Sequence, residues 1–338
     1  MRKELFVTLA NKDYVEQAKQ LFASAHLNGF WDGDYMLLSH EIPAQDLKWF
    51  TERGILVKEC KLLLEETWGD KKELPPLIAD KLYLFKEEFK VWEVVVYMDA
   101  DILINIPINR LKKTRTFAAV RELPYKKEFN RLYSQLNSEK CKTVLTSNFN
   151  LNKKAFNAGL IAFNTRIISP DLFDNLVRDL KTNIVSYKYG EQTSLNFIFY
   201  NKWKRLPLFY NSCVNYLPVL KLSRINRSVL HFAFREDYPS LWDMENQFYS
   251  NYSYNLEQSD NIDFKNSLKG VKLSKIGELW IGLRYNNILF FSYLVNEILV
   301  FFRKIYITPG RILGKTGERL RKHNPDLYYK LKKTKIER

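Results

Sequence analysis

The chain has 338 residues, of which 46% are hydrophobic, and a formal net charge of +15. The hydrophobic content supports a sizeable core and argues against a disordered chain. The three cysteines are odd in number and follow no close spacing, which argues against a disulfide framework or a zinc ribbon. We therefore expect a reducing compartment. The apolar stretch at residues 5–10 is too short for a signal-peptide core, so it predicts a first strand.

Short apolar runs with β-branched and aromatic residues predict strands along the chain. Stretches with apolar residues on one helical face lie between them and predict helices. This alternation predicts an α/β domain with a largely parallel sheet, in which ligands bind at the carboxyl ends of strands. The predicted strands are 5–9, 35–38, 55–57, 94–98, 117–120, 160–163 and 229–232, and the predicted helices are 14–26, 77–89 and 191–203.

The composition changes near residue 245, which predicts a catalytic domain over 1–245 and a C-terminal extension over 246–338. The apolar run 288–302 contains Glu297 and is too short to span a bilayer. Twelve basic and three acidic residues follow in 303–338, so the first 302 residues carry only +6. This pattern predicts an amphipathic, basic tail on an anionic membrane surface, with a solvated, partly helical C-terminus as the alternative.

Asp99-Ala100-Asp101 follows the apolar strand 94–98 in the segment VVVYMDADILI. Side chains two apart on an extended chain point the same way, so both carboxylates are expected to face one ligand. A divalent metal between them would offset their repulsion and bridge to a diphosphate. The alternative is a pair of turn carboxylates that cap the next element. A second such pattern, Asp32-Gly33-Asp34, is predicted to be a plain turn.

Several segments around this pair resemble glycosyltransferase family 8, in the family's own order. The resemblance covers about residues 4–242 and implies a GT-A type α/β sandwich with a mixed, mainly parallel sheet that binds a nucleotide-sugar. The segments are LANKDYVEQAKQLFASAHLNG from residue 9, ADKLYLF at 79–85, YMDADILI at 97–104, FNAGLIAFN at 156–164, GEQTSLN at 190–196, LPLFYN at 206–211 and HFAF at 231–234.

The resemblance implies a role for each matching position. Asp99, Asp101 and His231 correspond to metal ligands, and two carboxylates with one imidazole suit Mn(II), with Mg(II) possible. Glu191 and Gln192 correspond to catalytic positions near the anomeric carbon and the acceptor. The positions that correspond to UDP-sugar contacts are Leu9, Ala10, Asn11, Tyr14, Lys81, Asp99, Ala100, Asn157, Ala158 and Gly159.

Two departures from the family pattern stand out. After His231, Phe234 replaces a glycine and Asp237 stands where a phosphate-clamp lysine is expected, which leaves Arg235 as a hypothetical substitute. Glu191 replaces the usual aspartate and is one methylene longer.

The resemblance implies a retaining hexosyltransferase. It would move glucose or galactose from a UDP-sugar to a glycan or lipid-linked acceptor in cell-envelope polysaccharide synthesis, at the cytoplasmic face of the membrane. The alternative is a non-enzymatic protein that binds nucleic acid or membrane. Its nucleic-acid form is not expected, since the basic residues gather at the C-terminus and no nucleic-acid-binding motif occurs.

Overall fold

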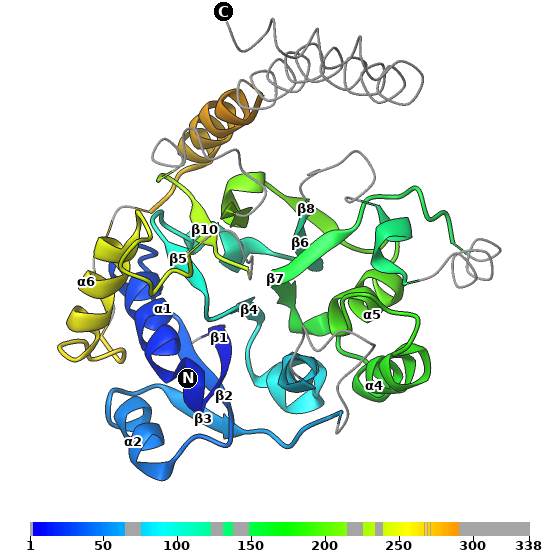
Figure 1. The fold of residues 1–338 in the computed structure, drawn as a ribbon, viewed down its shortest axis with the longest axis horizontal. Coiled ribbons are helices and arrows are strands. Elements are labelled where there is room, and N and C mark those ends of the chain that lie inside the picture. The colour runs from blue at the N-terminus through cyan, green and yellow to red at the C-terminus, as the bar shows by residue number, and fades with distance from the viewer. Residues whose placement is uncertain are drawn as a thin grey trace, which may run out of the picture. The chain divides into compact units, whose positions relative to one another are not determined.

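A seven-stranded sheet forms the centre of the fold (Figure 1). The computed structural model describes residues 3–64, 76–122, 131–137, 149–214, 226–233 and 239–290, apart from 267, 269 and 271. The strand order is β3-β2-β1-β4-β7-β6-β8. The strands are β1 Glu4–Asn11, β2 Asp34–His40, β3 Leu56–Glu59, β4 Val94–Met98, β6 Phe117–Arg121, β7 Phe156–Asn164 and β8 Lys204–Leu206.

The sheet is mixed and mainly parallel, as expected. Strands β3, β2, β1 and β4 run parallel, and β6 runs parallel to β8. Only β7, among the described strands of this sheet, is antiparallel to its neighbours β4 and β6. The carboxyl ends of β1, β4 and β6 therefore meet the amino end of β7 at one edge of the sheet.

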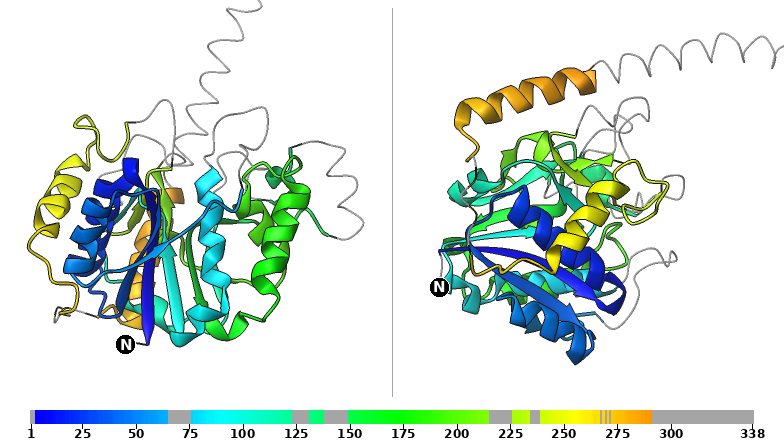
Figure 2. Two further views of the ribbon diagram at one scale, coloured as in Figure 1. Left: turned by 90° about the horizontal axis from the view of Figure 1, so that it is seen from below. Right: turned by 90° about the vertical axis from the view of Figure 1, so that its left-hand side faces the viewer.

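Helices cover both faces of the sheet (Figure 2). Helices α1 and α6 lie on one side, and α4 and α5 on the other. On α1, Val15, Ala18, Phe22 and Ala25 recur at helical spacing and are buried. The helices are α1 Val15–Leu27, α2 Ala44–Glu52, α4 Leu172–Asn183, α5 Glu191–Ile198 and α6 Tyr249–Ser259.

Alternate residues of β1 supply two separate cores, because successive side chains of a strand point to opposite faces. Leu5, Val7 and Leu9 pack into the core beneath α4 and α5. Phe6 points the other way, where its ring lies 5.7 Å from that of Trp31 and 6.1 Å from that of Phe22. Burying one such side chain contributes about 1.5–3 kcal/mol, so both faces anchor the strands that end at the site.

A second, three-stranded sheet continues from the end of β4. It has the order β5-β10-β9, with β10 antiparallel to β5 and parallel to β9. These strands are β5 Ile102–Ile104, β9 Ser212–Cys213 and β10 Val229–His231. This sheet joins segments that lie more than a hundred residues apart in the chain.

Two predicted helices differ from the structure. Residues 77–89 form two 3-10 helices instead of one amphipathic α-helix, and almost every residue from Ala79 to Phe85 is buried rather than one face alone. Helix α5 ends at Ile198, well before residue 203, and Asn201 has a left-handed φ of 61°. The 3-10 helices are η1 Lys12–Tyr14, η2 Pro76–Phe85, η3 Glu87–Val91, η4 Asn109–Lys113, η5 Leu132–Gln135, η6 Thr165–Ile167 and η7 Leu208–Tyr210.

Residues Met1–Asn286 form one compact unit and Asn287–Arg338 a second. Helix α6 belongs to the first unit and packs on α1, so contacts extend past residue 245. A last described helix runs over 275–290. None of the described helices is long and apolar enough to cross a membrane. The basic tail lies outside the described residues, and the domain division at 245 stays a prediction.

Candidate active site

The acidic pair stands where the buried strand β4 ends. All five residues of β4 are buried, and the chain turns at Asp99, whose carbonyl accepts a hydrogen bond from the Ile102 N–H at 3.2 Å. The Asp99 N–H donates to the Gly159 carbonyl at 2.9 Å, which ties the turn to β7. Both carboxylates are partly exposed. The turn therefore presents Asp99 and Asp101 at the carboxyl edge of the sheet.

Strand pairing brings His231 to these carboxylates. His231 pairs with Ile102 in the small sheet, and the Phe232 N–H donates to the Asp101 carbonyl at 3.1 Å. The His231 Nε2 atom lies 3.3 Å from Asp101 Oδ1 and 3.7 Å from Asp99 Oδ2. Burial opposes charge on this imidazole, but the carboxylate of Asp101 outweighs it and raises the pKa of His231 well above its usual value.

The three side chains fit a divalent cation. One ligand atom from each of Asp99, Asp101 and His231 lies within 4.8 Å of the other two. Asp101 Oδ1 is buried and accepts no hydrogen bond from any described residue, although buried carboxylate oxygens normally have a partner. Two carboxylates and an imidazole are the ligands that Mn(II) and similar ions take in proteins.

Because Gly159 has no side chain, it leaves room for the side chains of His231 and Asp99. A Cβ atom built at Gly159 would lie 2.2 Å from His231 Cε1 and 2.8 Å from Asp99 Oδ2. The family resemblance implies a UDP-sugar contact at Gly159, which stays a prediction. The structure adds that the missing side chain lets β7 approach His231 and Asp99.

A buried cation holds Asp99 from the other side. Lys81 Nζ lies 3.2 Å from Asp99 Oδ1 and 3.0 Å from Glu191 Oε1, and Lys81 is buried. The Tyr97 hydroxyl donates to the same Asp99 oxygen at 2.7 Å. Burial opposes the charge of Asp99, but Lys81, His231 and the Tyr97 hydrogen bond outweigh it and lower the pKa of this carboxyl.

Glu191 and Gln192, at the start of α5, are both buried. Glu191 forms an ion pair with Lys81, and Gln192 forms hydrogen bonds through both ends of its amide. Burial raises the pKa of Glu191, while its ion pair with Lys81 opposes the rise. The Gln192 Oε1 atom accepts from the Ala158 N–H at 3.0 Å, and its Nε2 donates to Glu122 Oε1 at 3.1 Å. Gln192 thus connects the segment at 157–159 with Glu122 at the end of β6.

Three residues without a predicted role belong to this site: Tyr97, Glu122 and Asn211. Glu122 accepts from Asn157 Nδ2 at 3.3 Å, and Asn211 bonds both Asn157 and His231. Tyr97 and Asn211 lie within motifs of the family, so the motifs contained the only signal for them. Glu122 follows a predicted strand, which alone did not single it out.

The positions expected to contact the nucleotide lie at the end of β1. Leu9 and Ala10 are buried, and the Asn11 side chain caps η1 by accepting from the Asp13 N–H at 3.2 Å. Tyr14 is 39% exposed, and its ring lies 5.7 Å from that of Trp242. Burial, followed by the charges of Asp101, Asp13 and Asp99, raises the pKa of Tyr14.

The second acidic pattern has structural partners. Asp32 forms an ion pair with Lys112, and Asp34 Oδ2 accepts from Trp92 Nε1 at 2.8 Å. A Cβ atom at Gly33 would lie 2.4 Å from the Glu4 carbonyl oxygen. The chain bends at Gly33 and Asp34 begins β2, so both acidic residues have structural partners and the turn itself stays a prediction. Residues 234–238, including the hypothetical phosphate contact Arg235, lie outside the described residues.

The Gly159 contacts generate a first prediction. Gly159→Ala should weaken Mn(II) binding roughly 10- to 100-fold, because the added methyl group displaces His231 or Asp99. Calorimetric titration with Mn(II) measures this. Gly282→Ala is the matched control, since its Cβ would meet Phe209 at an ordinary 3.5 Å. Equal Mn(II) affinity in both variants would contradict the proposed role of Gly159.

Comparison with known proteins supports the same interpretation. The model of glycosyl transferase family 8 matches residues 7–236, which is more than half of the chain. No curated protein sequence gives a significant match.

Similar solved structures share the fold at low sequence identity. The galactosyltransferase LgtC, solved with donor and acceptor sugar analogs, is 12% identical with a TM-score of 0.56, covering 81% of this chain and 99% of that one. The bifunctional glycosyltransferase WbbM is 17% identical with a TM-score of 0.56, and the match covers 78% of this chain and 50% of WbbM. GlyE of Streptococcus pneumoniae is 17% identical with a TM-score of 0.50, at 80% and 67% coverage.

The family match over residues 7–236, on a sheet whose carboxyl edge carries the acidic pair and His231, identifies the chain as a member of glycosyltransferase family 8 with a GT-A fold.

Proposed function

We propose that the protein is a metal-dependent, retaining hexosyltransferase that moves glucose or galactose from a UDP-sugar to a glycan or lipid-linked acceptor. The observation that carries the proposal is the convergence of Asp99, Asp101 and His231 within 4.8 Å at the carboxyl edge of the sheet. Family membership supports sugar transfer as the reaction. The similar fold of LgtC, which was solved with donor and acceptor sugar analogs, supports a two-substrate site.

Asp99, Asp101 and His231 would hold Mn(II), or Mg(II), in this proposal. The bound ion supplies positive charge that stabilises the departing UDP. Lys81 and Tyr97 fix Asp99 through one carboxylate oxygen, Oδ1. The other oxygen, Oδ2, is the one nearer to His231, at 3.7 Å from Nε2. The buried lysine and tyrosine therefore orient a ligand rather than act as free acids.

The proposed donor site extends along the sheet edge from β1 to β7. Leu9, Ala10, Asn11 and Tyr14 would contact the uridine, Lys81 would lie nearest the diphosphate, and Ala100 would line the bend between the acidic residues. Asn157, Ala158 and Gly159 would contact the sugar. The order β1-β4-β7 supports this direction, because adjacent strands lie about 4.8 Å apart and place these groups in sequence across the edge.

The contacts of Glu191 and Gln192 favour direct transfer on one face of the sugar. A double displacement needs a carboxylate free to attack the anomeric carbon. Glu191 is instead buried beside Lys81, and Gln192 is bonded at both ends of its amide. We propose that they position the donor while the acceptor hydroxyl attacks from the face that UDP leaves.

The carboxylate pair gives the direct test. Asp99→Asn and Asp101→Asn should each lower sugar transfer by roughly 100-fold or more and weaken Mn(II)-dependent UDP binding, because each removes a charged ligand. UDP release is measured with UDP-glucose, UDP-galactose and their N-acetyl relatives, which also identifies the donor.

Asp32→Asn is the matched control, since it alters the other acidic pair at a residue bonded to Lys112. It should keep near-normal transfer. Full activity of both Asp99→Asn and Asp101→Asn in the presence of a chelator would overturn the proposed function.

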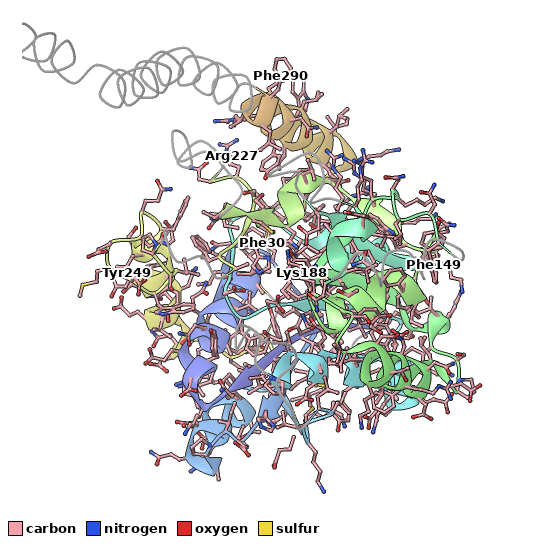
Figure 3. All side chains as sticks on the ribbon, turned by 45° about the vertical axis from the view of Figure 1, so that its right-hand side comes forward. Phe30, Phe149, Lys188, Arg227, Tyr249 and Phe290 are labelled. Carbon is pink, nitrogen blue, oxygen red and sulfur yellow. The ribbon has the colours of Figure 1, made fainter. Side chains whose placement is uncertain are left out.

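We also propose a peripheral position on the inner face of the cytoplasmic membrane, which suits a lipid-linked envelope acceptor. The helix at 275–290 carries four exposed apolar side chains on one face, and Figure 3 shows this helix with its last described residue, Phe290, labelled. Ile276, Leu279, Trp280 and Leu283 are 69%, 62%, 68% and 48% exposed and recur at helical spacing.

The opposite side of this helix contacts other residues of the protein. Glu278 forms an ion pair with Arg110 at 3.2 Å, and Gly282 lies against Phe209. Lys275 and Arg284 are exposed beside the apolar side chains. An apolar ridge with flanking basic residues matches what an anionic membrane surface binds, and the basic sequence after residue 303 adds to the attraction.

The double variant Leu279→Ser with Trp280→Ser should reduce sedimentation with phosphatidylglycerol vesicles on the order of tenfold, because it removes most of the apolar ridge. Tyr254→Ser on α6, an aromatic residue that is 57% exposed, is the control and should bind like the wild type. Unchanged sedimentation of the double variant would remove the membrane proposal without touching the catalytic one.

A further inference from the structure

Hydrogen bonds connect the backbone of β7 to the imidazole of His231 through two buried amides. The Gly159 N–H donates to Asn157 Oδ1 at 2.9 Å, and Asn211 Nδ2 donates to the same oxygen at 2.8 Å. Asn211 Oδ1 lies 2.9 Å from His231 Nδ1. Asn211 is 1% exposed and stands immediately before β9, whose Cys213 pairs with His231.

The direction of each hydrogen bond follows from the one before it. A backbone N–H can only donate, so the Asn157 atom that faces Gly159 must be its oxygen. That oxygen can only accept, so the Asn211 atom facing it must be the NH₂ group. The remaining atom of Asn211 is then its oxygen, and His231 Nδ1 must carry the hydrogen that this oxygen accepts.

Neighbouring contacts agree with this assignment. The Asn157 NH₂ group faces the Glu122 carboxylate at 3.3 Å, as a donor should. The Cys213 Sγ atom lies 3.8 Å from Asn211 Oδ1, to which its thiol can donate, and 3.6 Å from His231 Nδ1.

The other imidazole nitrogen faces a competing acceptor. His231 Nε2 lies 3.3 Å from Asp101 Oδ1, which is buried and accepts no hydrogen bond from the described residues. A neutral imidazole with its hydrogen on Nε2 would donate to that oxygen and would have no lone pair there for a metal. For Nε2 to bind a metal, a hydrogen-bond acceptor beside Nδ1 must therefore stabilise the tautomer that has its hydrogen on Nδ1.

We propose that Asn211 is the positioning residue that keeps the hydrogen of His231 on Nδ1 and so leaves Nε2 free to bind the metal. This inference rests on the proposed metal site. It also places the segment at 157–159 and the metal ligand in one hydrogen-bonded network. Asn157 orients the Asn211 amide by accepting a hydrogen bond from its NH₂ group. The Asn211 oxygen in turn orients His231 by accepting the hydrogen on Nδ1.

Two substitutions separate this role from simple packing. Asn211→Leu has a similar volume but no acceptor, and it should weaken Mn(II) binding roughly 10- to 100-fold. Asn211→Asp keeps an acceptor for the Nδ1 hydrogen and should bind Mn(II) at least about tenfold more tightly than Asn211→Leu. The control Asn255→Leu removes another buried amide, on α6, and should bind Mn(II) like the wild type. Mn(II) affinity is measured by electron paramagnetic resonance without UDP-sugar.

Nitrogen-15 NMR of histidine-labelled protein tests the hydrogen position directly. The chain has four histidines, and His231→Gln identifies the signal of His231 by its loss. For the neutral ring we expect the single hydrogen on Nδ1, both in the metal-free wild type at a pH high enough to deprotonate the imidazolium and in the Mg(II)-loaded wild type. A neutral ring with its hydrogen on Nε2, or equal Mn(II) affinity of wild type and a folded Asn211→Leu, would overturn the inference.

These readouts separate the inference from the function on which it rests. If the wild type binds neither Mn(II) nor Mg(II), the proposed metal site fails. The metal-free NMR spectrum still decides whether Asn211 sets the hydrogen of His231. If Asn211→Leu does not fold, that spectrum and Asn211→Asp give the answer, since affinity of Asn211→Asp at least about tenfold below wild type would also contradict the role.

Discussion

The mutual repulsion of Asp99 and Asp101 is the constraint around which the site is organised. Two carboxylates at the end of a buried strand are costly unless cations stand close to them. Lys81 lies on one side of Asp99, and His231 lies on the other, within ion-pair distance of both carboxylates. In the metal-bound protein, a divalent cation would supply the positive charge beside both carboxylates, and neutral His231 would bind it together with Asp99 and Asp101.

The fold meets that constraint by bringing distant segments to one sheet edge. Strand β5 continues from the acidic turn and pairs with β10, which carries His231. Strand β7 can approach both ligands only because residue 159 lacks a side chain. The same strand carries Asn157, which accepts a hydrogen bond from Asn211, the residue immediately before β9 in the sequence. Metal ligands, the proposed sugar contacts and their supporting amides therefore form one connected structure.

Much of this arrangement could be predicted from sequence, and the reason for the rest is physical. The strand before Asp99 and the order of family motifs predicted the GT-A fold and the convergence with His231, which the structure confirms. The partners of Lys81 and Asn211 were not predicted, because those contacts join residues 18 to 110 positions apart that no periodicity relates. The segment at 77–89 was wrongly predicted as an α-helix, since burial on all sides hides its 3-10 geometry.

The most direct test of the proposed metal site is an anomalous-scattering measurement on crystals grown with Mn(II) and UDP. We expect one strong manganese peak within bonding distance of Asp99, Asp101 and His231 Nε2, with the diphosphate of UDP on its open side. A manganese peak elsewhere on the protein, or UDP bound with no metal between the two carboxylates, would contradict it.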